Sequence, residues 1–306
     1  MNNTSSGKGF LFAVFAYILW GALPVYWKLL ASVPSLHILG FRIVFSLLLV
    51  SAVLFYRRNI SWLKFYKDRR QTLMLTLGAF MLSFNWGLYI WAVNSGHTIE
   101  AAVGYYINPL VSVVLGLIFF KEKLKTMQWI AFALAMTGVL ILTIFSGAPP
   151  WISLGLALSF GFYGLIKKTV SLSALESLGA ETLIAAPLGL LMLFSSLGND
   201  GQAVYGLQGL SYLPELPAPV IALLLGCGAV TTLPLYLFSN GAKMLPLTTM
   251  GFIQFLAPSI TFLEGVFIFH ETFPPRNFIV FGCIWAAVIL YIVSLKIAAR
   301  IPKPGD

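Results

Sequence analysis

The sequence of 306 residues is apolar and basic: hydrophobic residues make up 59%, charged residues only 9%, and the formal net charge is +9. Soluble domains carry about 25% charged residues, so this composition excludes a single water-soluble core and indicates an integral membrane protein. The two cysteines, Cys227 and Cys283, both lie inside apolar runs. They are therefore interpreted as small core residues and not as a disulfide or metal framework.

Ten apolar runs follow one another along the chain, each of about the length that crosses about 30 Å of hydrocarbon as a helix. They lie near residues 9–30, 36–56, 72–94, 99–120, 128–146, 151–170, 175–197, 218–239, 247–269 and 277–298. The first run is too long for a signal peptide and lacks a small-residue cleavage site. The sequence therefore predicts an all-α membrane protein with ten transmembrane helices.

Basic residues gather in alternate loops, and basic loops stay on the cytoplasmic side of a membrane. The amino-terminal segment, the even-numbered loops and the carboxyl tail hold Lys8, Arg57, Arg58, Lys64, Lys67, Arg69, Arg70, Lys121, Lys123, Lys125, Lys167, Lys168, Lys243, Lys296, Arg300 and Lys303. We therefore expect a multi-pass protein of the cytoplasmic (inner) membrane with both termini in the cytoplasm. The basic excess then reports topology and contact with the lipid bilayer, and no nucleic-acid partner is expected.

Two stretches indicate a tandem duplication. Residues 104–110, running on to 121–123, are similar to residues 251–258, running on to 270–272. One constant shift aligns Pro109 with Pro258, Gly116 with Gly265, Phe120 with Phe269, Glu122 with Glu271, Ile130 with Ile279, Phe132 with Phe281 and Val139 with Val288. Earlier in the chain, Trp20-Gly21 through Lys28 matches Phe160-Gly161 through Lys168, and Leu39 through Arg42 matches Leu178 through Glu181.

The duplication predicts two repeats, residues 1–147 and 148–306, with five helices each. Because five is odd, the second repeat enters the membrane from the opposite side, so the halves form an inverted repeat. Pro109 and Pro258 each fall in the middle of an apolar run, where they are expected to break a helix and face a shared interior. Halves of opposite topology can open in turn to either side around a site at mid-membrane, which is the geometry of a carrier.

Several motifs resemble the RarD branch of the EamA transporters, within the drug/metabolite transporter superfamily. They are residues 104–110, Asn85-Trp86, residues 91–94, Trp20-Gly21 with Pro24, and residues 251–258. The resemblance covers nearly the whole chain and implies a ten-helix bacterial permease of the inner membrane, with a link to chloramphenicol sensitivity. It supports a role for Arg42, although the family pattern usually has a His beside this arginine, where this chain has Phe41.

Three charged residues fall within the predicted spans, where an ion costs at least about 2.5 to 3.5 kcal/mol. Arg42 and Glu264 are expected at a similar depth near the outer side. Arg42 is interpreted either as a snorkelling or ion-paired residue, with Glu264 as partner, or as a group that captures an anionic substrate or gates the outer vestibule. Glu181 lies nearer the inner boundary, either wet at the interface or acting as a coupling site for a proton or cation. Glu264 is expected chiefly as an ion-pair partner and is retained as a coupling or gate residue.

Four further polar residues lie mid-membrane: Asn85, Tyr105, Asn108 and Gln254. Each is interpreted either as a hydrogen-bonding contact between helices or as a substrate contact. Asn108 adjoins Pro109, and Tyr105 lies about one turn earlier on nearly the same face. Taken together, the four residues favour a substrate site near the two prolines.

No catalytic motif accompanies these residues. The three histidines fall in predicted outward-facing loops at unrelated spacings, and no glycine loop for phosphate is present, so neither an enzyme, a metal centre nor a cofactor is expected. The sequence predicts a secondary carrier for a small organic metabolite or drug. A membrane-embedded enzyme and a lipid flippase are the alternatives, and a homodimer is left open.

Overall fold

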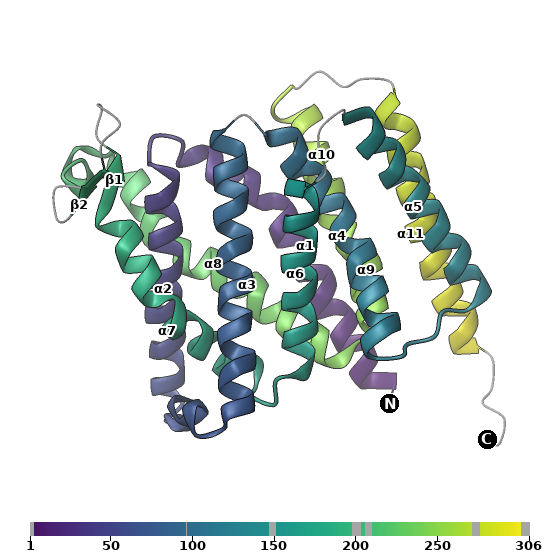
Figure 1. Cartoon of the computed structure of the whole chain (residues 1–306), viewed down its shortest axis with the longest axis horizontal. Helices are drawn as coiled ribbons and strands as arrows, with labels where there is room; N and C mark the ends of the chain where they lie inside the picture. Colours follow the sequence, from purple (N-terminus) through teal and green to yellow (C-terminus); the bar gives the residue numbers. More distant parts are fainter. Residues whose placement is uncertain are drawn as a thin grey trace.

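The computed structural model describes residues 3–95, 97–146, 151–197, 203–205, 210–270 and 276–300, and long helices that run side by side dominate it (Figure 1). The helices are α1 (Asn3–Leu29), α2 (Ser35–Tyr56), α3 (Arg69–Asn94), α4 (Thr98–Phe119), α5 (Thr126–Ser146), α6 (Trp151–Thr169), α7 (Ala174–Leu193), α8 (Ala218–Met244), α9 (Leu247–Gln254), α10 (Leu256–Phe267) and α11 (Arg276–Arg300), with short 3-10 helices η1 (Ser61–Lys67) and η3 (Leu213–Glu215). The start of α1 and the end of α11 lie at the same end of the bundle (Figure 1).

Within the described residues, nine segments are long and apolar enough to cross a membrane, with α9 and α10 counted together as one. They correspond to nine of the ten predicted spans. The remaining predicted span, 151–170, is α6, whose last turn carries Lys167 and Lys168. Ten of its nineteen residues are buried, Ser153 and Ser159 among them. Lys167, Lys168 and the other polar residues of α6 lower its mean hydropathy, and the buried positions of Ser153 and Ser159 do not face lipid.

The two prolines that were predicted to break helices behave differently. The ninth predicted span is interrupted at Phe255, between α9 and α10, three residues before Pro258. In contrast, α4 continues through Pro109 without interruption, so the predicted break there is wrong. Neighbouring helices can stabilise a proline within a membrane helix, and Pro109 is buried among them.

The link between α7 and α8 departs from the predicted all-helical pattern. The seventh apolar run was expected to reach residue 197, but α7 ends at Leu193 and a short strand β1 (Ser195–Leu197) follows. It pairs antiparallel with β2 (Ala203–Tyr205), at the end of the bundle opposite the chain termini (Figure 1). In the part of the chain that the structure describes, the fold is therefore helical apart from one two-stranded sheet.

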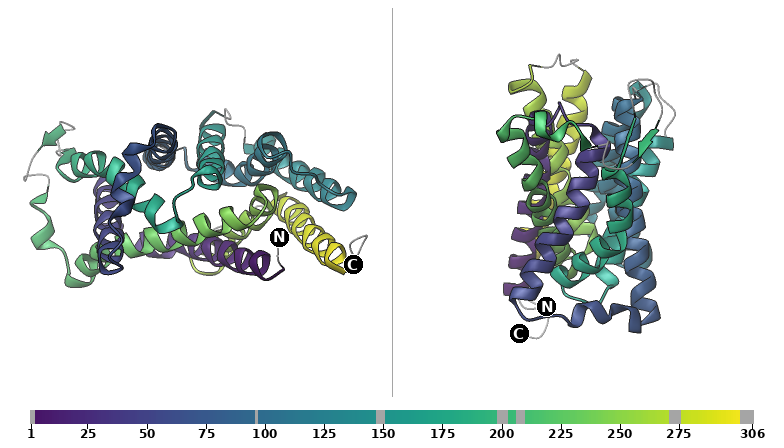
Figure 2. Two further views of the ribbon diagram at one scale, coloured as in Figure 1. Left: turned by 90° about the horizontal axis from the view of Figure 1, so that it is seen from below. Right: turned by 90° about the vertical axis from the view of Figure 1, so that its left-hand side faces the viewer.

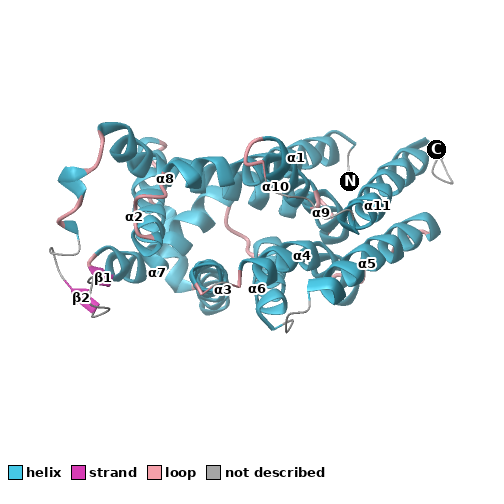
Figure 3. Cartoon of the chain, turned by 90° about the horizontal axis from the view of Figure 1, so that it is seen from above, coloured by secondary structure: helices cyan, strands magenta, loops and turns pink. Residues whose placement is uncertain are grey.

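The helices form two layers when viewed along their axes (Figure 3). One layer contains α3, α4, α5, α6 and α7, the other contains α1, α8, α9, α10 and α11, and α2 lies at one end between them. The side view shows the same two layers (Figure 2). The most extensive helix contacts are α4 with α6, α5 with α11, α2 with α7 and α1 with α8. Each of these pairs joins one helix from residues 1–147 to one from residues 148–306.

Glycines allow three pairs of helices, α2–α7, α1–α10 and α4–α6, to approach closely. In the α2–α7 pair, Gly40 packs against the side chain of Leu193, and Gly179 packs against the side chain of Leu54. A similar exchange joins the inner helices: Gly21 of α1 packs against Ile260 of α10, and Gly161 of α6 packs against Val111 of α4. Small residues at such crossings bring helix backbones together in membranes.

Candidate functional site

A small cavity lies between α2, α3, α7 and α8. Arg42 of α2 and Glu181 of α7 line it at the same time, with side chains from α3 and α8 completing the wall. The lining is Arg42, Ile43, Ser46, Ala79, Leu82, Ser83, Trp86, Leu178, Glu181, Thr182, Ala185, Thr231, Thr232 and Leu235. Its volume of about 20 Å³ holds about one water molecule. A substrate therefore requires these helices to move apart.

Arg42 lies against aromatic rings. Its guanidinium carbon is 4.2 Å from the ring centre of Trp86 and 4.8 Å from that of Trp27, and Nε donates to the hydroxyl of Thr231 at 3.1 Å. Tyr89 and Tyr105 lie near the guanidinium. Cation–π contacts and one hydrogen bond thus orient Arg42 without a carboxylate partner among the described residues.

The predicted ion pair between Arg42 and Glu264 is wrong. Glu264 lies on α10, is 7% exposed, and its Oε2 has no hydrogen-bond partner among the described residues. The two side chains come from helices that do not share the cavity. Depth within the membrane was the basis of the expected pair, but equal depth does not bring two helix faces together.

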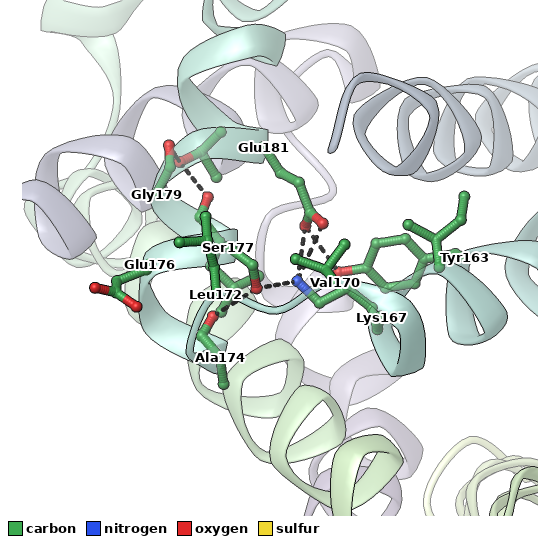
Figure 4. A network of polar contacts seen from close by, with 12 residues as sticks. Tyr163, Lys167, Val170, Leu172, Ala174, Glu176, Ser177, Gly179 and Glu181 are labelled. Atoms are coloured by element: carbon green, nitrogen blue, oxygen red, sulfur yellow. Dashed lines mark hydrogen bonds and ion pairs between the residues drawn. The ribbon is translucent and has the colours of Figure 1, made fainter. Parts of the chain in front are cut away.

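Glu181 belongs to a buried polar network (Figure 4). Both of its carboxylate oxygens lie 3.1 Å from the Lys167 ammonium, and the Tyr163 hydroxyl donates to Oε2 at 3.2 Å. Lys167 also donates to the Ser177 hydroxyl at 2.6 Å. Lys167 is 0% and Glu181 2% exposed, so the interpretation of Glu181 as a wet interfacial residue is wrong. A buried ion pair of this kind is stable only with its other hydrogen bonds satisfied, as they are here.

Lys167 was also assigned to a cytoplasmic loop, and the structure corrects that assignment. It points inward from the last turn of α6. Two neighbouring lysines bind backbone carbonyls at the same end of the bundle: Lys168 binds the carbonyl of Leu245, and Lys243 binds that of Val170 at 3.1 Å. The spacing of four residues between Tyr163 and Lys167 was the available sequence signal, since such residues share a helix face.

Glu122 joins the two halves of the chain at the end of the bundle where the termini lie. Its oxygens accept the backbone N–H groups of Leu247 at 2.7 Å and Thr248 at 2.8 Å. These groups open α9, so a carboxylate complements the helix dipole there. The Lys168 ammonium lies 3.8 Å from the same carboxylate. Glu271, which aligns with Glu122 in the predicted repeat, lies outside the described residues.

The mid-membrane amides have different surroundings. Asn85 donates to the carbonyl of Leu156 and to the hydroxyl of Ser159, both at 2.9 Å, and thereby links α3 to α6. Asn85 therefore makes the hydrogen-bonding contact between helices that was one of the two roles considered for it. Asn108 is 2% exposed, and its Oδ1 has no hydrogen-bond partner among the described residues. A buried amide oxygen without a donor marks a place where water or a ligand group can bind.

Hydrogen bonds join α4 to the broken ninth span near the two prolines. The Tyr106 hydroxyl donates to the carbonyl of Pro258 at 3.1 Å, and the Ser112 hydroxyl donates to Gln254 Oε1 at 3.3 Å. Both prolines are buried, as expected of residues facing a shared interior. Tyr105 instead packs edge-on against Tyr89, with ring centres 5.6 Å apart. The predicted site residues therefore do not form one cluster: Arg42 and Glu181 line the cavity, whereas Gln254 lies at the contact between α4 and the ninth span.

His37 is not in a loop, as predicted, but fully buried in the first turn of α2. Its Nδ1 lies 2.7 Å from the Tyr212 hydroxyl oxygen, and the two rings stack with centres 5.3 Å apart. Burial raises the pKa of Tyr212 to about 12, so this phenol stays protonated at neutral pH. The contact holds the segment before α8 against α2.

The part of the chain that the structure describes contains no cluster of His, Cys, Asp or Glu that could hold a metal ion.

Long apolar helices with buried charges between them define a multi-pass membrane protein. The chain belongs to the EamA-like transporter family, whose model matches residues 7–144. It is 42% identical to the uncharacterized transporter YojE of Bacillus subtilis, with 96% of each chain covered. It is 41% identical to protein RarD of Streptomyces exfoliatus, with 95% of this chain and 90% of the relative covered.

The name of a more distant relative refers to chloramphenicol sensitivity. The chloramphenicol-sensitive protein RarD of Pseudomonas aeruginosa is 30% identical, with 93% of each chain covered. One solved structure, described only as the crystal structure of a protein, has a TM-score of 0.67 at 15% identity and covers 95% of this chain and 98% of its own. That likeness concerns the fold alone. The transporter family, with RarD among the relatives, agrees with the resemblance found in the sequence.

Proposed function

We propose that this transporter is a secondary carrier that moves a small organic metabolite or drug across the cytoplasmic membrane by alternating access. In this proposal residues 1–147 and 148–306 are inverted repeats that enclose the substrate. One observation supports the proposal most directly. Arg42 and Glu181 line one cavity, and they occupy equivalent positions in the aligned repeats. A site on the axis between two inverted halves can be exposed to either side by equivalent movements.

Reciprocal contacts support the inverted repeat. Leu54 and Leu193 are equivalent positions, as are Gly40 and Gly179, and each glycine packs against the leucine of the other half. Such an exchange, in which i contacts j′ and i′ contacts j, is the signature of a two-fold axis. The Gly21–Ile260 and Gly161–Val111 contacts repeat the pattern.

A third set of reciprocal contacts consists of two lysine–phenylalanine contacts, one toward each end of the bundle. The Lys28 ammonium lies 3.8 Å from the ring centre of Phe269, and the Lys168 ammonium lies 5.2 Å from that of Phe120. In the aligned repeats Lys28 corresponds to Lys168 and Phe269 to Phe120. We infer that these pairs belong to two equivalent gates, one at each side of the membrane.

The proposal gives each charged residue a role. Arg42 binds substrate, with Tyr105 beside it, while Asn108 and Gln254 extend the site toward Pro109 and Pro258. Glu181, held by Lys167, is assigned to a gate because it links α6 to α7. Glu264 is assigned to coupling because it is buried with an oxygen free to bind a proton or cation. The membrane-embedded enzyme is set aside, because the family is a transporter family.

Transport is tested with chloramphenicol, which the name of one relative suggests as the first probe. We expect overproduction and deletion to shift the chloramphenicol sensitivity of cells in opposite directions. Inverted vesicles containing the protein should accumulate or release labelled chloramphenicol faster than protein-free vesicles, and a pH gradient should change the rate. Rates that equal those of protein-free vesicles, for this probe and for a panel of metabolites, would contradict the proposal.

A further inference from the structure

We propose that the substrate held at the cavity between α2, α3, α7 and α8 is an organic anion, in which a carboxylate is joined to an apolar or aromatic body. Arg42 would bind the carboxylate, and the rings around it would bind the body. The inference rests on the proposed transport function and adds the chemical class of the cargo. It is carried by the charges of the cavity wall, the free hydrogen-bond donors of Arg42 and the side chains beside it.

The cavity has a cation without a matching carboxylate. Its one acidic lining residue is Glu181, and both oxygens of that carboxylate bind Lys167. The pair is neutral overall, so it leaves the charge of Arg42 uncompensated. Glu264 is on α10, outside the lining. Because an isolated ion is costly within a membrane, an anionic group of the substrate would stabilise Arg42 there.

Most N–H donors of the Arg42 guanidinium have no hydrogen-bond acceptor among the described residues. Arginine carries five N–H donors. Within the described residues only Nε is engaged, in the bond to Thr231, so the terminal nitrogens have no protein acceptor. The Thr231 bond and the ring of Trp86 hold the guanidinium plane in one orientation. A planar fork with free terminal N–H groups matches a carboxylate through two parallel hydrogen bonds.

The surroundings of Arg42 are suited to an apolar body. Trp27 and Trp86 lie against the guanidinium, and Tyr89 and Tyr105 lie near it. All four side chains are partly exposed in this structure, unlike the fully buried Tyr163 and Lys167. Aromatic surfaces bind planar or apolar groups through stacking and edge contacts. The carboxylate and the body would thus be recognised by adjacent groups of the same site.

The test measures binding apart from transport, by isothermal titration calorimetry on the purified full chain in detergent. The probes are benzoate and indole-3-acetate, each compared with its neutral amide. We expect at least one acid to bind at least about tenfold more tightly than its amide, since a charge-assisted pair of hydrogen bonds distinguishes them. Arg42→Gln should remove that preference, and Arg42→Lys should keep only part of it because lysine lacks the fork.

Two controls make the result specific. Arg57→Gln changes an exposed arginine at the end of the same helix α2 and should leave the preference unchanged. Thr231→Val retains the charge of Arg42 but removes its hydrogen bond, and should weaken acid binding less than Arg42→Gln. Variants are compared only as single species on size-exclusion chromatography.

The proposal is overturned if the amides bind as tightly as the acids, if neither acid binds at millimolar concentration, or if Arg42→Gln keeps the preference. Failure of the transport proposal would look different. Chloramphenicol is neutral and has no carboxylate, so its movement across vesicles reports transport without reporting anion recognition. Acid binding without any vesicle transport would contradict the carrier function alone, whereas transport of chloramphenicol without acid preference would contradict the substrate class alone.

Discussion

The Lys167 ammonium lies 3.1 Å from each carboxylate oxygen of Glu181, and both side chains are buried between α6 and α7. The hydroxyls of Tyr163 and Ser177 complete the hydrogen bonds of the pair. The network joins a helix of the protein core to a helix that lines the cavity. Its integrity therefore bears on both stability and transport.

Lys167→Met is expected to destabilise the protein by about 3 to 5 kcal/mol, because it leaves the Glu181 carboxylate buried without a cation. Glu181→Leu should cost a similar amount for the converse reason. The double variant Lys167→Met/Glu181→Leu should recover most of the loss, since no charge then remains buried. Thermal unfolding in detergent measures all three. Equal stability of the single variants and the wild type would show that the pair is not a structural contact.

Gly228→Ala is expected to destabilise the crossing of α2 and α8. A Cβ at Gly228 would lie 2.5 Å from the backbone carbonyl of Phe45, and backbone atoms cannot rotate away. Overpacking of this kind costs about 1 to 3 kcal/mol. Phe45 is three residues after Arg42 in the same helix, so binding at Arg42 should weaken as well.

Gly87→Ala is the matched control for that variant. Gly87 also lies within a helix, α3, but a Cβ added there meets no atom within 4 Å beyond the chain neighbours and the backbone of its own helix turns. Alanine favours helix over glycine by about 0.8 to 1 kcal/mol, so this variant should unfold at the same or a higher temperature. If both variants lower the unfolding temperature equally, close approach at Gly228 is not the reason.

Glu122→Ala should loosen the start of α9. The carboxylate accepts two backbone N–H groups there, and loss of such a cap costs about 0.5 to 2 kcal/mol. We expect a lower unfolding temperature and faster reaction of a cysteine introduced at Thr248 with a thiol reagent, in a background lacking Cys227 and Cys283. Glu215→Ala, which removes an exposed carboxylate in η3, should change neither property.

Reporter fusions test the orientation. Both ends of the described chain lie at one end of the bundle, together with the η1 segment (Figure 1). Because basic loops stay inside, green fluorescent protein fused at either terminus should fluoresce, and alkaline phosphatase inserted after residue 210 should be active. Activity of alkaline phosphatase at either terminus would reverse the predicted orientation.

The class of protein, nearly all of the spans and the family could be predicted from the sequence alone. Each of these follows from local properties: a backbone in lipid must satisfy its own hydrogen bonds, so a membrane helix is visible as one apolar run. The inverted repeat stays a prediction, based on the similar sequences around Pro109 and Pro258. Arg42 was singled out by its charge within a predicted span and by the family resemblance.

Only the tertiary structure decided which groups meet. Glu264 was the expected partner of Arg42, yet Arg42 lies against Trp86 and Glu181 pairs with Lys167. An ion pair depends on which faces of distant helices touch, and neither hydropathy nor depth records that. The same holds for Pro109, where packing of neighbouring helices keeps α4 continuous although the residue favours a break.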